Sequence, residues 1–520
     1  MVKVIIFGLF GNRLEIERIL DDEAEIIGYS DTGALFEDEE TTPHTFEYKP
    51  FYKAEQLADV DFDYIVVCNK REAVYAETEN FLMKHGIDRR KIVPACWLKF
   101  NESAFQSTYA EYMELNTEYE GAIFGMSYSR RGLLPDFMSG KYFKFSLNGM
   151  DLHAHELYIE NLVRNSQKFH KTKYVILDLP YYIFNWDVCS SNQIFNRMSM
   201  YDEFNDWGHF KERENADDYI AQYHALKLLV GKKFESVQSA YSNSYMFPRK
   251  FDAGKTDCRA NGAWVKSYPK TREENKYRFL RICKMIKSIG AKLIIVVYPF
   301  SPAFLKLNGQ IIQENRKEFY EIINEYQEIM GYSVLDFLEK SYAKFPDTFF
   351  YNPTHLNLHG AVQMTKVLDR EIRKIILGEK ELKKGKINIK YSAAVYSVAW
   401  MPFEENGSIC GSSGCYLGLR GMRIRIESKE DLHVKYSVFS IASGWTDVVC
   451  DGESTAAKNG DLIDAFRVYL DGDAAEKYSV RYRAFIGGCG WSEWMSDGAV
   501  AGDCSENNRV EAIKIIVCEK

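Results

Sequence analysis

Short apolar runs alternate with amphipathic stretches along the first two thirds of the chain. Apolar runs of this length predict buried strands, and apolar positions that recur with a period of about 3.6 residues predict helices. Strands alternating with helices are typical of a parallel, doubly wound sheet. For residues 1–112 the pattern predicts strands at Val4–Phe7, Ala24–Asp31 and Asp63–Cys68, with helices at Arg13–Leu20 and Tyr75–His85.

The same alternation resumes over residues 116–380 and predicts a second α/β domain. The stretch 183–270 interrupts it with aromatic and polar residues, and long insertions between a strand and a helix commonly build binding sites. We therefore expect an inserted cap over the sheet at 183–270. The expected strands are Gly121–Phe124, Tyr174–Leu179, Leu293–Tyr298 and Ser333–Phe337, and the expected helices are Leu152–Ser166, Glu273–Ile289, Asn315–Met330 and Leu358–Leu377.

The pattern changes to β after a lysine-rich connector, and residues 387–520 contain a threefold repeat. No single unit can bury its own apolar face, so three units together should close into a trefoil- or prism-like β domain. Three landmarks share a spacing of 45 and then 46 residues: Tyr391, Tyr436 and Tyr482; Trp400, Trp445 and Trp491; Gly407, Gly452 and Gly498.

Length and charge narrow the class of protein. At 520 residues the chain can hold three or four domains of roughly 100–200 residues each. The net charge is −8, and no long block of basic residues occurs, which argues against nucleic acid and anionic membranes as main partners. No apolar stretch approaches the roughly 20 residues that span a bilayer, and the first residues lack the pattern of a signal peptide. A cytoplasmic location is therefore expected.

The cysteines agree with that location. They number eleven, which is odd, and they form no metal-ligand array, so free thiols in a reducing compartment are expected and no metal site is predicted. A disulfide framework in the last quarter remains the alternative there. The six cysteines concerned are Cys410, Cys415, Cys450, Cys489, Cys504 and Cys518.

The first strand of the N-terminal α/β part ends in a turn that contains two glycines. Gly8 and Gly11 border this turn, and Asp31 closes the second strand where a ribose-binding acid would lie. The glycine spacing is not GxGxxG, so two interpretations stay open. The module either binds a nucleotide or dinucleotide through these residues, or it is a Rossmann-like unit that only packs or binds something else. It resembles the nucleotide-binding-like domain at the start of several bacterial surface-polysaccharide proteins.

A serine and a histidine in the middle domain form the main candidate site. Ser127 follows the first strand in Gly125-Met126-Ser127, and His355 lies before the last helix. In an α/β fold such positions bring a nucleophile and its base together. The backbone N–H groups of Ser127 and Gly149 could face a developing oxyanion. Alternatively, Ser127 only caps a helix and His355 is structural.

These segments resemble the SGNH/GDSL hydrolase superfamily, in particular the branch found with polysaccharide O-acetylation and cell-wall D-alanylation proteins. The order matches: Gly-x-Ser after strand one, a glycine after strand two and a late His-Leu-Asn-x-x-Gly. The resemblance implies an esterase or O-acyltransferase without a cofactor, with Ser127 as nucleophile and His355 as base, acting on an acylated surface polysaccharide or its precursor.

Two positions depart from the SGNH pattern. Asn352 stands where the triad aspartate belongs, so it can hydrogen-bond the imidazole but cannot stabilise imidazolium by charge. Asp347 is the nearest substitute acid. The oxyanion asparagine expected after the third strand is missing, and Asn148 or Asn185 could replace it.

The third repeat closely resembles the clostridial hydrophobic repeat, a family named for its tryptophan, and the first two units look like degenerate relatives. The resemblance implies a surface or secreted protein with a carbohydrate- or protein-binding role. Trp445, Trp491 and Trp494 are the candidate carbohydrate-binding residues, although tryptophans repeated in this way are more often core residues of the repeat. The alternative function is therefore a non-catalytic binding or assembly protein with a degenerate hydrolase domain.

Overall fold

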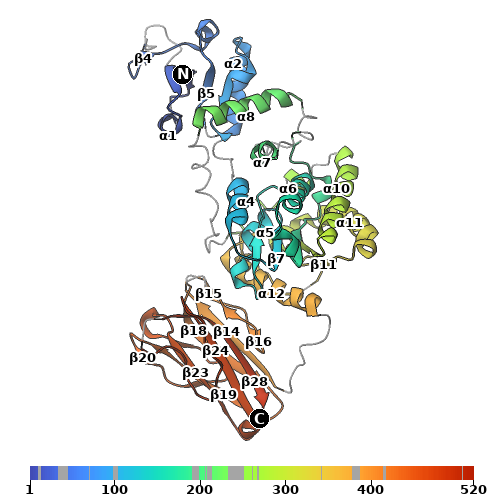
Figure 1. The fold of residues 1–520 in the computed structure, drawn as a ribbon, viewed down its shortest axis with the longest axis vertical. Helices are drawn as coiled ribbons and strands as arrows, with labels where there is room; N and C mark the ends of the chain where they lie inside the picture. Colours follow the sequence, from blue (N-terminus) through green and yellow to red (C-terminus); the bar gives the residue numbers. More distant parts are fainter. Residues whose placement is uncertain are drawn as a thin grey trace. The chain divides into compact units, whose positions relative to one another are not determined.

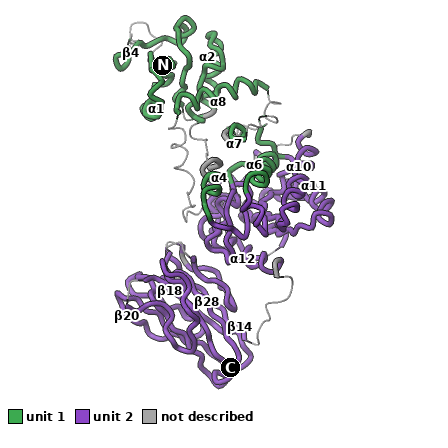
Figure 2. Tube along the Cα trace, in the orientation of Figure 1, with its two compact units in different colours: residues 1–116, 147–166, 186–244 green, residues 117–146, 167–185, 245–520 purple. Residues whose placement is uncertain are grey.

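The computed structural model describes residues 1–9, 13–32, 45–69, 71–97, 104–189, 198–204, 207, 214–231, 251–260, 262–265, 269–340, 342–377, 387–396, 398–413, 417–505 and 508–520. The chain forms two compact units (Figure 2). The first contains residues 1–116, 147–166 and 186–244, and the second contains residues 117–146, 167–185 and 245–520. No disulfide joins the cysteines that the structure describes.

The first unit is built on a four-stranded parallel sheet with the order β2-β1-β5-β6 (Figure 1). Its central strand β1 carries Val4, Ile5 and Ile6, which are fully buried, as expected for a parallel strand covered on both faces. The predicted parallel sheet is confirmed. The elements are β1 Val2–Phe7, α1 Arg13–Ile19, β2 Ala24–Ser30, β3 Thr45–Phe46, β4 Lys49–Pro50, η2 Ala54–Asp59, β5 Tyr64–Val67, α2 Glu72–Lys84, η3 Arg89–Lys91 and β6 Ile92–Pro94.

Helix α8, Ala216–Val230, packs within the first unit against the N-terminal α/β part. Its Gln222 Nε2 donates to Tyr75 Oη at 3.1 Å and to Glu79 Oε1 at 2.8 Å. This helix comes from the stretch 183–270, and an inserted cap over the middle sheet stays a prediction. The unit also contains α4 Ala104–Glu114, α6 Leu152–Asn165 and α7 Met198–Glu203.

The second unit begins with a five-stranded parallel sheet with the order β11-β10-β9-β7-β8. Because β7 lies between β8 and β9, the order along the chain reverses at β7, and ligand sites of open α/β sheets lie at the carboxyl ends of strands beside such a reversal. The strands are β7 Gly121–Phe124, β8 Tyr142–Lys144, β9 Tyr174–Asp178, β10 Lys292–Val297 and β11 Ser333–Asp336. The helices are α5 Ser127–Gly132, η4 Pro135–Phe137, η5 Phe169–Lys171, η6 Ile183–Asn185, η9 Gly262–Trp264, α10 Pro269–Ser288, α11 Pro302–Met330, η10 Asp347–Phe349 and α12 Leu358–Leu377.

Helix α11 and the segment around His355 differ most from the sequence prediction. Helix α11 begins at Pro302 instead of Asn315, because Ser301 Oγ accepts the Phe304 N–H and caps a turn that the pattern did not reveal. His355 does not leave a strand of the main sheet. It lies in a separate antiparallel hairpin made of β12, Phe350–Asn352, and β13, His355–Leu356.

Residues 387–520 form three five-stranded antiparallel sheets, drawn in orange to red in Figure 1. Each sheet joins the two long strands of one repeat to a short strand of another: β22 pairs with β18, β27 with β23 and β17 with β28. The strands are β14 Asn388–Val395, β15 Ala399–Trp400, β16 Glu404–Glu405, β17 Cys410–Gly411, β18 Leu419–Glu427, β19 His433–Ser440, β20 Gly444–Trp445, β21 Val449–Cys450, β22 Thr455–Ala456, β23 Ala465–Asp471, β24 Tyr478–Ile486, β25 Gly490–Trp491, β26 Met495–Ser496, β27 Ala501–Gly502 and β28 Val510–Glu519, with η11 Lys458–Gly460 and η12 Ala475–Lys477 between them.

The repeated glycines lie in turns that require positive φ. Asn406-Gly407, Asp451-Gly452 and Asp497-Gly498 each have positive φ at both residues, a combination that favours Asn or Asp followed by Gly. Each glycine N–H donates to the last long strand of another repeat, from Gly407 to Ile515 O, from Gly452 to Ile424 O and from Gly498 to Val468 O. The first repeat thus bonds to the third, so that each repeat is hydrogen-bonded to the other two. The mixed α/β class with a C-terminal antiparallel region is confirmed, and the trefoil- or prism-like shape stays a prediction.

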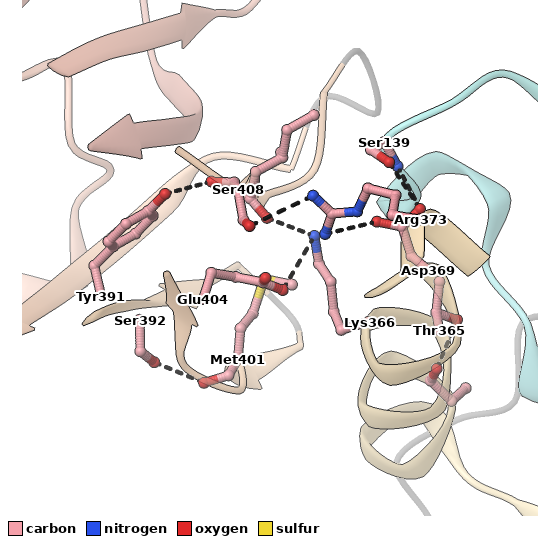
Figure 3. Close-up of polar contacts among 12 residues, drawn as sticks. Ser139, Thr365, Lys366, Asp369, Arg373, Tyr391, Ser392, Met401, Glu404 and Ser408 are labelled. Atoms are coloured by element: carbon pink, nitrogen blue, oxygen red, sulfur yellow. Dashed lines mark hydrogen bonds and ion pairs between the residues drawn. The ribbon is translucent and has the colours of Figure 1, made fainter. Parts of the chain in front are cut away.

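Helix α12 and the C-terminal sheets share one hydrophobic core. Leu134, Phe137 and Val362 belong to the same buried cluster as the repeat tyrosines. At its edge Lys366 Nζ donates to Ile409 O at 2.7 Å and lies 3.8 Å from Glu404 Oε1, with both ionic side chains buried (Figure 3).

Candidate active site

Strand β7 delivers Ser127 at the reversal point of the middle sheet. Phe124 ends the strand, and Ser127 begins α5 two residues after Gly125. A Cβ added to Gly125 would lie 2.2 Å from Ser129 Oγ and 2.4 Å from Asp178 Cβ. Gly125 is therefore required by the close approach of these two residues.

Asp178 holds the turn that carries Ser127. Its Oδ2 accepts the N–H groups of Met126 at 3.1 Å and Ser129 at 2.9 Å. Burial raises the pKa of Asp178 to about 6, although these N–H groups favour the ionised form. Asp178 is not among the candidate site residues of the sequence analysis, although an acid at the end of a buried strand is a signal that the sequence contains.

His355 lies between Ser127 and Asn352 and is within hydrogen-bond distance of both. His355 Nε2 lies 2.7 Å from Ser127 Oγ, and His355 Nδ1 lies 3.0 Å from Asn352 Oδ1. The structure thus brings together the three residues that the sequence singled out. Their catalytic roles stay predictions.

The hydrogen bonds of Asn352 fix the tautomer of the imidazole. Its Oδ1 also accepts the backbone N–H groups of His355 at 2.9 Å and Thr354 at 3.1 Å. An atom that accepts two backbone N–H groups is the carbonyl oxygen of the amide, so the contact with Asn352 is a hydrogen bond when Nδ1 of His355 carries the proton. The Thr354 hydroxyl, 3.2 Å from Nδ1, can accept from the same proton. Nε2 is then the lone-pair nitrogen, and Ser127 Oγ donates to it. The asparagine therefore favours the tautomer that a general base needs.

The surroundings of His355 keep its imidazole neutral. Burial, together with the positive charge of Arg131, lowers the pKa of His355 to about 3. The ring of Tyr128 stacks on the imidazole with 5.1 Å between ring centroids and 25° between planes. Protonation of this imidazole is thus opposed by burial and by Arg131, and no carboxylate among the described residues bonds to its Nδ1.

An aromatic cluster borders the Ser127–His355 pair. Tyr128 Oη and Tyr182 Oη lie 3.0 Å apart, and the Tyr182 ring contacts Trp264 edge-on at 4.9 Å. Trp264 also contacts Phe300 at 5.3 Å. Trp264 comes from the predicted cap 183–270, so at least this residue of the stretch lies near the candidate site. The cluster supplies an apolar environment in which electrostatic interactions are strengthened.

Asp347, considered as a substitute for the triad aspartate, and Asn185, considered as a substitute for the oxyanion asparagine, both bond to other groups. Asp347 Oδ1 accepts the Ala303 N–H at 3.1 Å. Asn185 Nδ2 donates to Glu318 Oε2 at 2.5 Å. Gly149 has φ of +63°, which favours glycine, and belongs to the first compact unit. The oxyanion roles of Gly149 and Asn148 stay predictions.

The N-terminal candidate residues form a bonded turn. Gly8 has φ of +98°, and Asp31 Oδ2 accepts the Leu9 N–H at 2.7 Å. Gly11 lies outside the described residues. This bond accounts for an acid at the end of the second strand without a ribose, and nucleotide binding stays a prediction. In the part of the chain that the structure describes, no group of His, Cys, Asp and Glu is arranged to hold a metal ion.

The candidate tryptophans of the repeats stack against cations. Trp445 lies under Arg467 at 4.3 Å, and all the candidate rings are half-buried. Trp491 has Arg483 at 4.8 Å and Lys514 at 5.1 Å, and Trp494 has Arg483 at 4.8 Å and Arg481 at 5.7 Å. The tryptophans are thus neither fully buried core residues nor open platforms.

Comparison with known proteins gives one family match and several distant structural neighbours. Residues 486–517 match the family described as clostridial hydrophobic W. No curated protein matches this chain. Within the described residues, no helix is long and apolar enough to cross a membrane.

Three solved structures are similar to about half of the chain. A proposed acylhydrolase from Bacteroides fragilis is 11% identical, covers 53% of this chain and 97% of its own, and has a TM-score of 0.27. A GDSL-like lipase from Bacteroides thetaiotaomicron is 8% identical, with coverages of 54% and 98% and a TM-score of 0.25. A lipase/acylhydrolase from Enterococcus faecalis is 11% identical, with coverages of 49% and 96% and a TM-score of 0.24. Of the sequence resemblances, the one between the third repeat and the clostridial hydrophobic W family is confirmed directly by the match at residues 486–517.

Proposed function

We propose that the middle part of the chain is an SGNH-like serine esterase or O-acyltransferase that acts on an acylated surface polysaccharide or its precursor. The observation that carries the proposal is the 2.7 Å contact between Ser127 Oγ and His355 Nε2, with Nδ1 held by Asn352. The position of Ser127 at the reversal point of a parallel sheet supports it. The C-terminal repeats would recruit the polymer or a protein partner.

The pair has the groups that acyl transfer needs. Nε2 of His355 takes the Ser127 hydroxyl proton as Oγ attacks the acyl carbonyl carbon, which gives a tetrahedral intermediate. The imidazolium then protonates the leaving alkoxide as the ester C–O bond breaks. Water or a sugar hydroxyl attacks the resulting acyl-serine, with His355 again as base. Water gives hydrolysis, and a sugar hydroxyl gives transfer.

The same geometry predicts slow chemistry. The imidazolium formed during attack is stabilised only by the carbonyl dipole of Asn352, and the charge of Arg131 opposes it. Without a carboxylate beside Nδ1, we expect a rate about 10- to 100-fold lower than that of a complete triad, because Asn352 supplies the orientation of the ring but not the charge. A modest turnover is therefore expected, together with stoichiometric reaction with strong acylating or phosphonylating reagents.

Substitution of the nucleophile tests the proposal. Ser127→Ala should abolish fluorophosphonate labelling and lower the hydrolysis of p-nitrophenyl acetate by at least about 10³-fold, because the acyl-enzyme of this mechanism forms on Ser127 Oγ. Ser288→Ala, which removes an exposed hydroxyl at the end of α10, is the control and should behave like the unmodified protein. Turnover that survives Ser127→Ala unchanged would rule out this chemistry.

A non-catalytic binding or assembly protein is the second candidate. Asn352 in place of an acid and Arg131 beside the imidazole favour it, because both reduce the ability of His355 to hold a proton. In that case Ser127 would resist fluorophosphonate and the purified protein would still bind glycan or a protein partner. Labelling of Ser127 would decide against it.

A further inference from the structure

The three repeats carry the same arrangement on their outward faces, and the third repeat departs from it. In each repeat a tryptophan stacks under a cation of the last long strand: Trp400 under Arg423 at 4.7 Å, Trp445 under Arg467 at 4.3 Å and Trp491 under Lys514 at 5.1 Å. The strand pairing makes these three cations equivalent, because they lie opposite Ser392, Ser437 and Arg483.

The first departure is a second cation opposite the first. In the second repeat Arg467 Nε donates to Ser437 Oγ at 2.9 Å, so the cross-strand pair is a hydrogen bond. In the third repeat the serine is replaced by Arg483, directly across from Lys514. Like charges directly opposite each other destabilise a sheet. Arg373 of α12, which pairs with Asp369 at 3.2 Å, adds a further positive charge near Lys514, and burial together with these charges lowers the pKa of Lys514.

The second departure is the loss of an acid. In the first two repeats the outward cation before the core tyrosine has a carboxylate: Lys390 bonds to Glu427 at 2.8 Å and Lys435 pairs with Asp471. The equivalent cation of the third repeat is Arg481, and the acid is replaced by Cys518. Among the described residues, neither Arg481, Arg483 nor Lys514 makes an ion pair.

The two departures concentrate positive charge beside tryptophan on one face of one sheet. Strand alternation places Arg481 and Arg483 outward, since Tyr482 between them is fully buried. Trp491 lies across from Phe485, on the same outward face. We call this surface the cationic face; it consists of Arg481, Arg483, Lys514, Trp491 and Trp494.

We propose that the cationic face binds a glycan segment that carries carboxylate or phosphate groups. Guanidinium groups match the geometry of both anions, and a half-buried tryptophan beside them offers an edge for a sugar ring. The ligand would neutralise the repulsion between Arg483 and Lys514, against which the described residues supply tryptophan rings but no carboxylate. The proposal deepens the carbohydrate-binding role proposed for the repeats and does not depend on the chemistry of Ser127.

Calorimetric titration of the full-length protein with three polymers tests the proposal. Polygalacturonate oligomers supply carboxylates, poly(glycerol phosphate) supplies phosphates, and dextran is neutral. We expect at least one anionic polymer to bind and dextran not to bind, with affinity falling as salt is raised. The anionic polymer that binds identifies the source of the charge. Because the whole protein has a net charge of −8, general attraction to polyanions is not expected.

Arg483→Ser restores the residue found at the equivalent positions of the other two repeats. It should weaken binding by about tenfold, the effect of losing a charge-assisted hydrogen bond, and leave the thermal midpoint equal or higher. Lys458→Ser, an exposed position in the same domain, makes the same change in charge and should leave the affinity within about twofold.

Three outcomes would overturn the proposal: no binding of either anionic polymer, equal binding of dextran, or equal weakening by Lys458→Ser. Ser127→Ala should bind the polymer as the unmodified protein does. Failure of the acyl chemistry and failure of the cationic face are therefore separate results.

Discussion

At the scale of single residues, Asn352 controls what His355 can do. Its amide oxygen gathers three N–H groups, two from the backbone and one from the imidazole. It therefore orients the ring as an aspartate would, but without negative charge. Burial and Arg131 then lower the pKa of His355 to about 3, so the ring is a neutral base throughout the physiological range.

Asn352→Asp should restore the missing charge. A carboxylate in this position strengthens the bond to Nδ1 and stabilises imidazolium, so kcat/KM for p-nitrophenyl acetate should rise by about 10- to 100-fold near pH 8. The pKa of His355 should rise with it, and the rate should then fall as the pH drops through the new value. The unmodified protein should show no such loss between pH 5 and 8, because the imidazole is already deprotonated.

A pH–rate profile of both proteins checks this prediction. Asn352→Ala is the control and should lower the rate, since the ring loses its orienting partner. An Asn352→Asp profile that matches the unmodified protein would show that His355 is not the base.

The residues of the candidate triad could be predicted from short motifs, but their electrostatic neighbours could not. Ser127 and His355 each follow an apolar run, and that local pattern was enough to single them out. Arg131 acts on His355 across more than 200 positions of sequence, and only the folded chain brings them together. Asp178 was visible in the sequence as a strand-end acid, yet its bonds to the serine turn depend on the pairing of β7 with β9.

At the scale of elements, the β7–α5 turn is stabilised by a buried carboxyl whose ionisation opposes folding. The pKa of Asp178 is raised from 3.8 to about 6 by burial. Between these values the folded state holds more protons than the unfolded state, so the free energy of unfolding falls as the pH rises through this window. The loss amounts to up to about 3 kcal/mol above pH 6.

Asp178→Asn should remove this loss. The amide oxygen can still accept the Met126 and Ser129 N–H groups, so the variant should match the unmodified protein near pH 4 and exceed its free energy of unfolding at pH 7 by about 1–3 kcal/mol. Urea unfolding at the two pH values measures the difference. Asp178→Ala, which leaves the Met126 and Ser129 N–H groups unpaired, should be less stable than the unmodified protein at both pH values. A difference between Asp178→Asn and the unmodified protein that does not change with pH would contradict the assignment.

Element types were more predictable than element boundaries and partners. The buried strands of both parallel sheets were evident because Val, Ile and Phe runs have few alternatives. The hairpin that carries His355 was missed, since β12 and β13 together span only a few residues and their pairing depends on an Asn-Pro turn. The 45-residue period predicted three equivalent units, but the exchange of short strands between them is a tertiary feature with no local signal.

At the scale of the second unit, the candidate catalytic part and the repeats should behave as one cooperative structure. Helix α12 begins three residues after His355, and its Val362 lies in the same core as Tyr391. The buried ion pair of Lys366 and Glu404 crosses from this helix to the first repeat (Figure 3). Burial raises the pKa of Glu404, and Lys366 counteracts the rise. A charge in this position is tolerated only while its partner is present.

Glu404→Leu should therefore lower the free energy of unfolding by about 3 kcal/mol, because Lys366 is left buried without a counter-charge. Combining it with Lys366→Met should recover most of the loss, apart from about 1 kcal/mol for the unpaired Ile409 carbonyl. Urea unfolding followed by fluorescence measures the free energy of unfolding. Fluorophosphonate labelling of Ser127 at each urea concentration shows whether the candidate catalytic part is still folded. If the two parts are coupled, the single variant shifts the unfolding midpoint and the loss of labelling together. Labelling that persists after the repeats have unfolded would instead mean that the shared core does not support the position of His355.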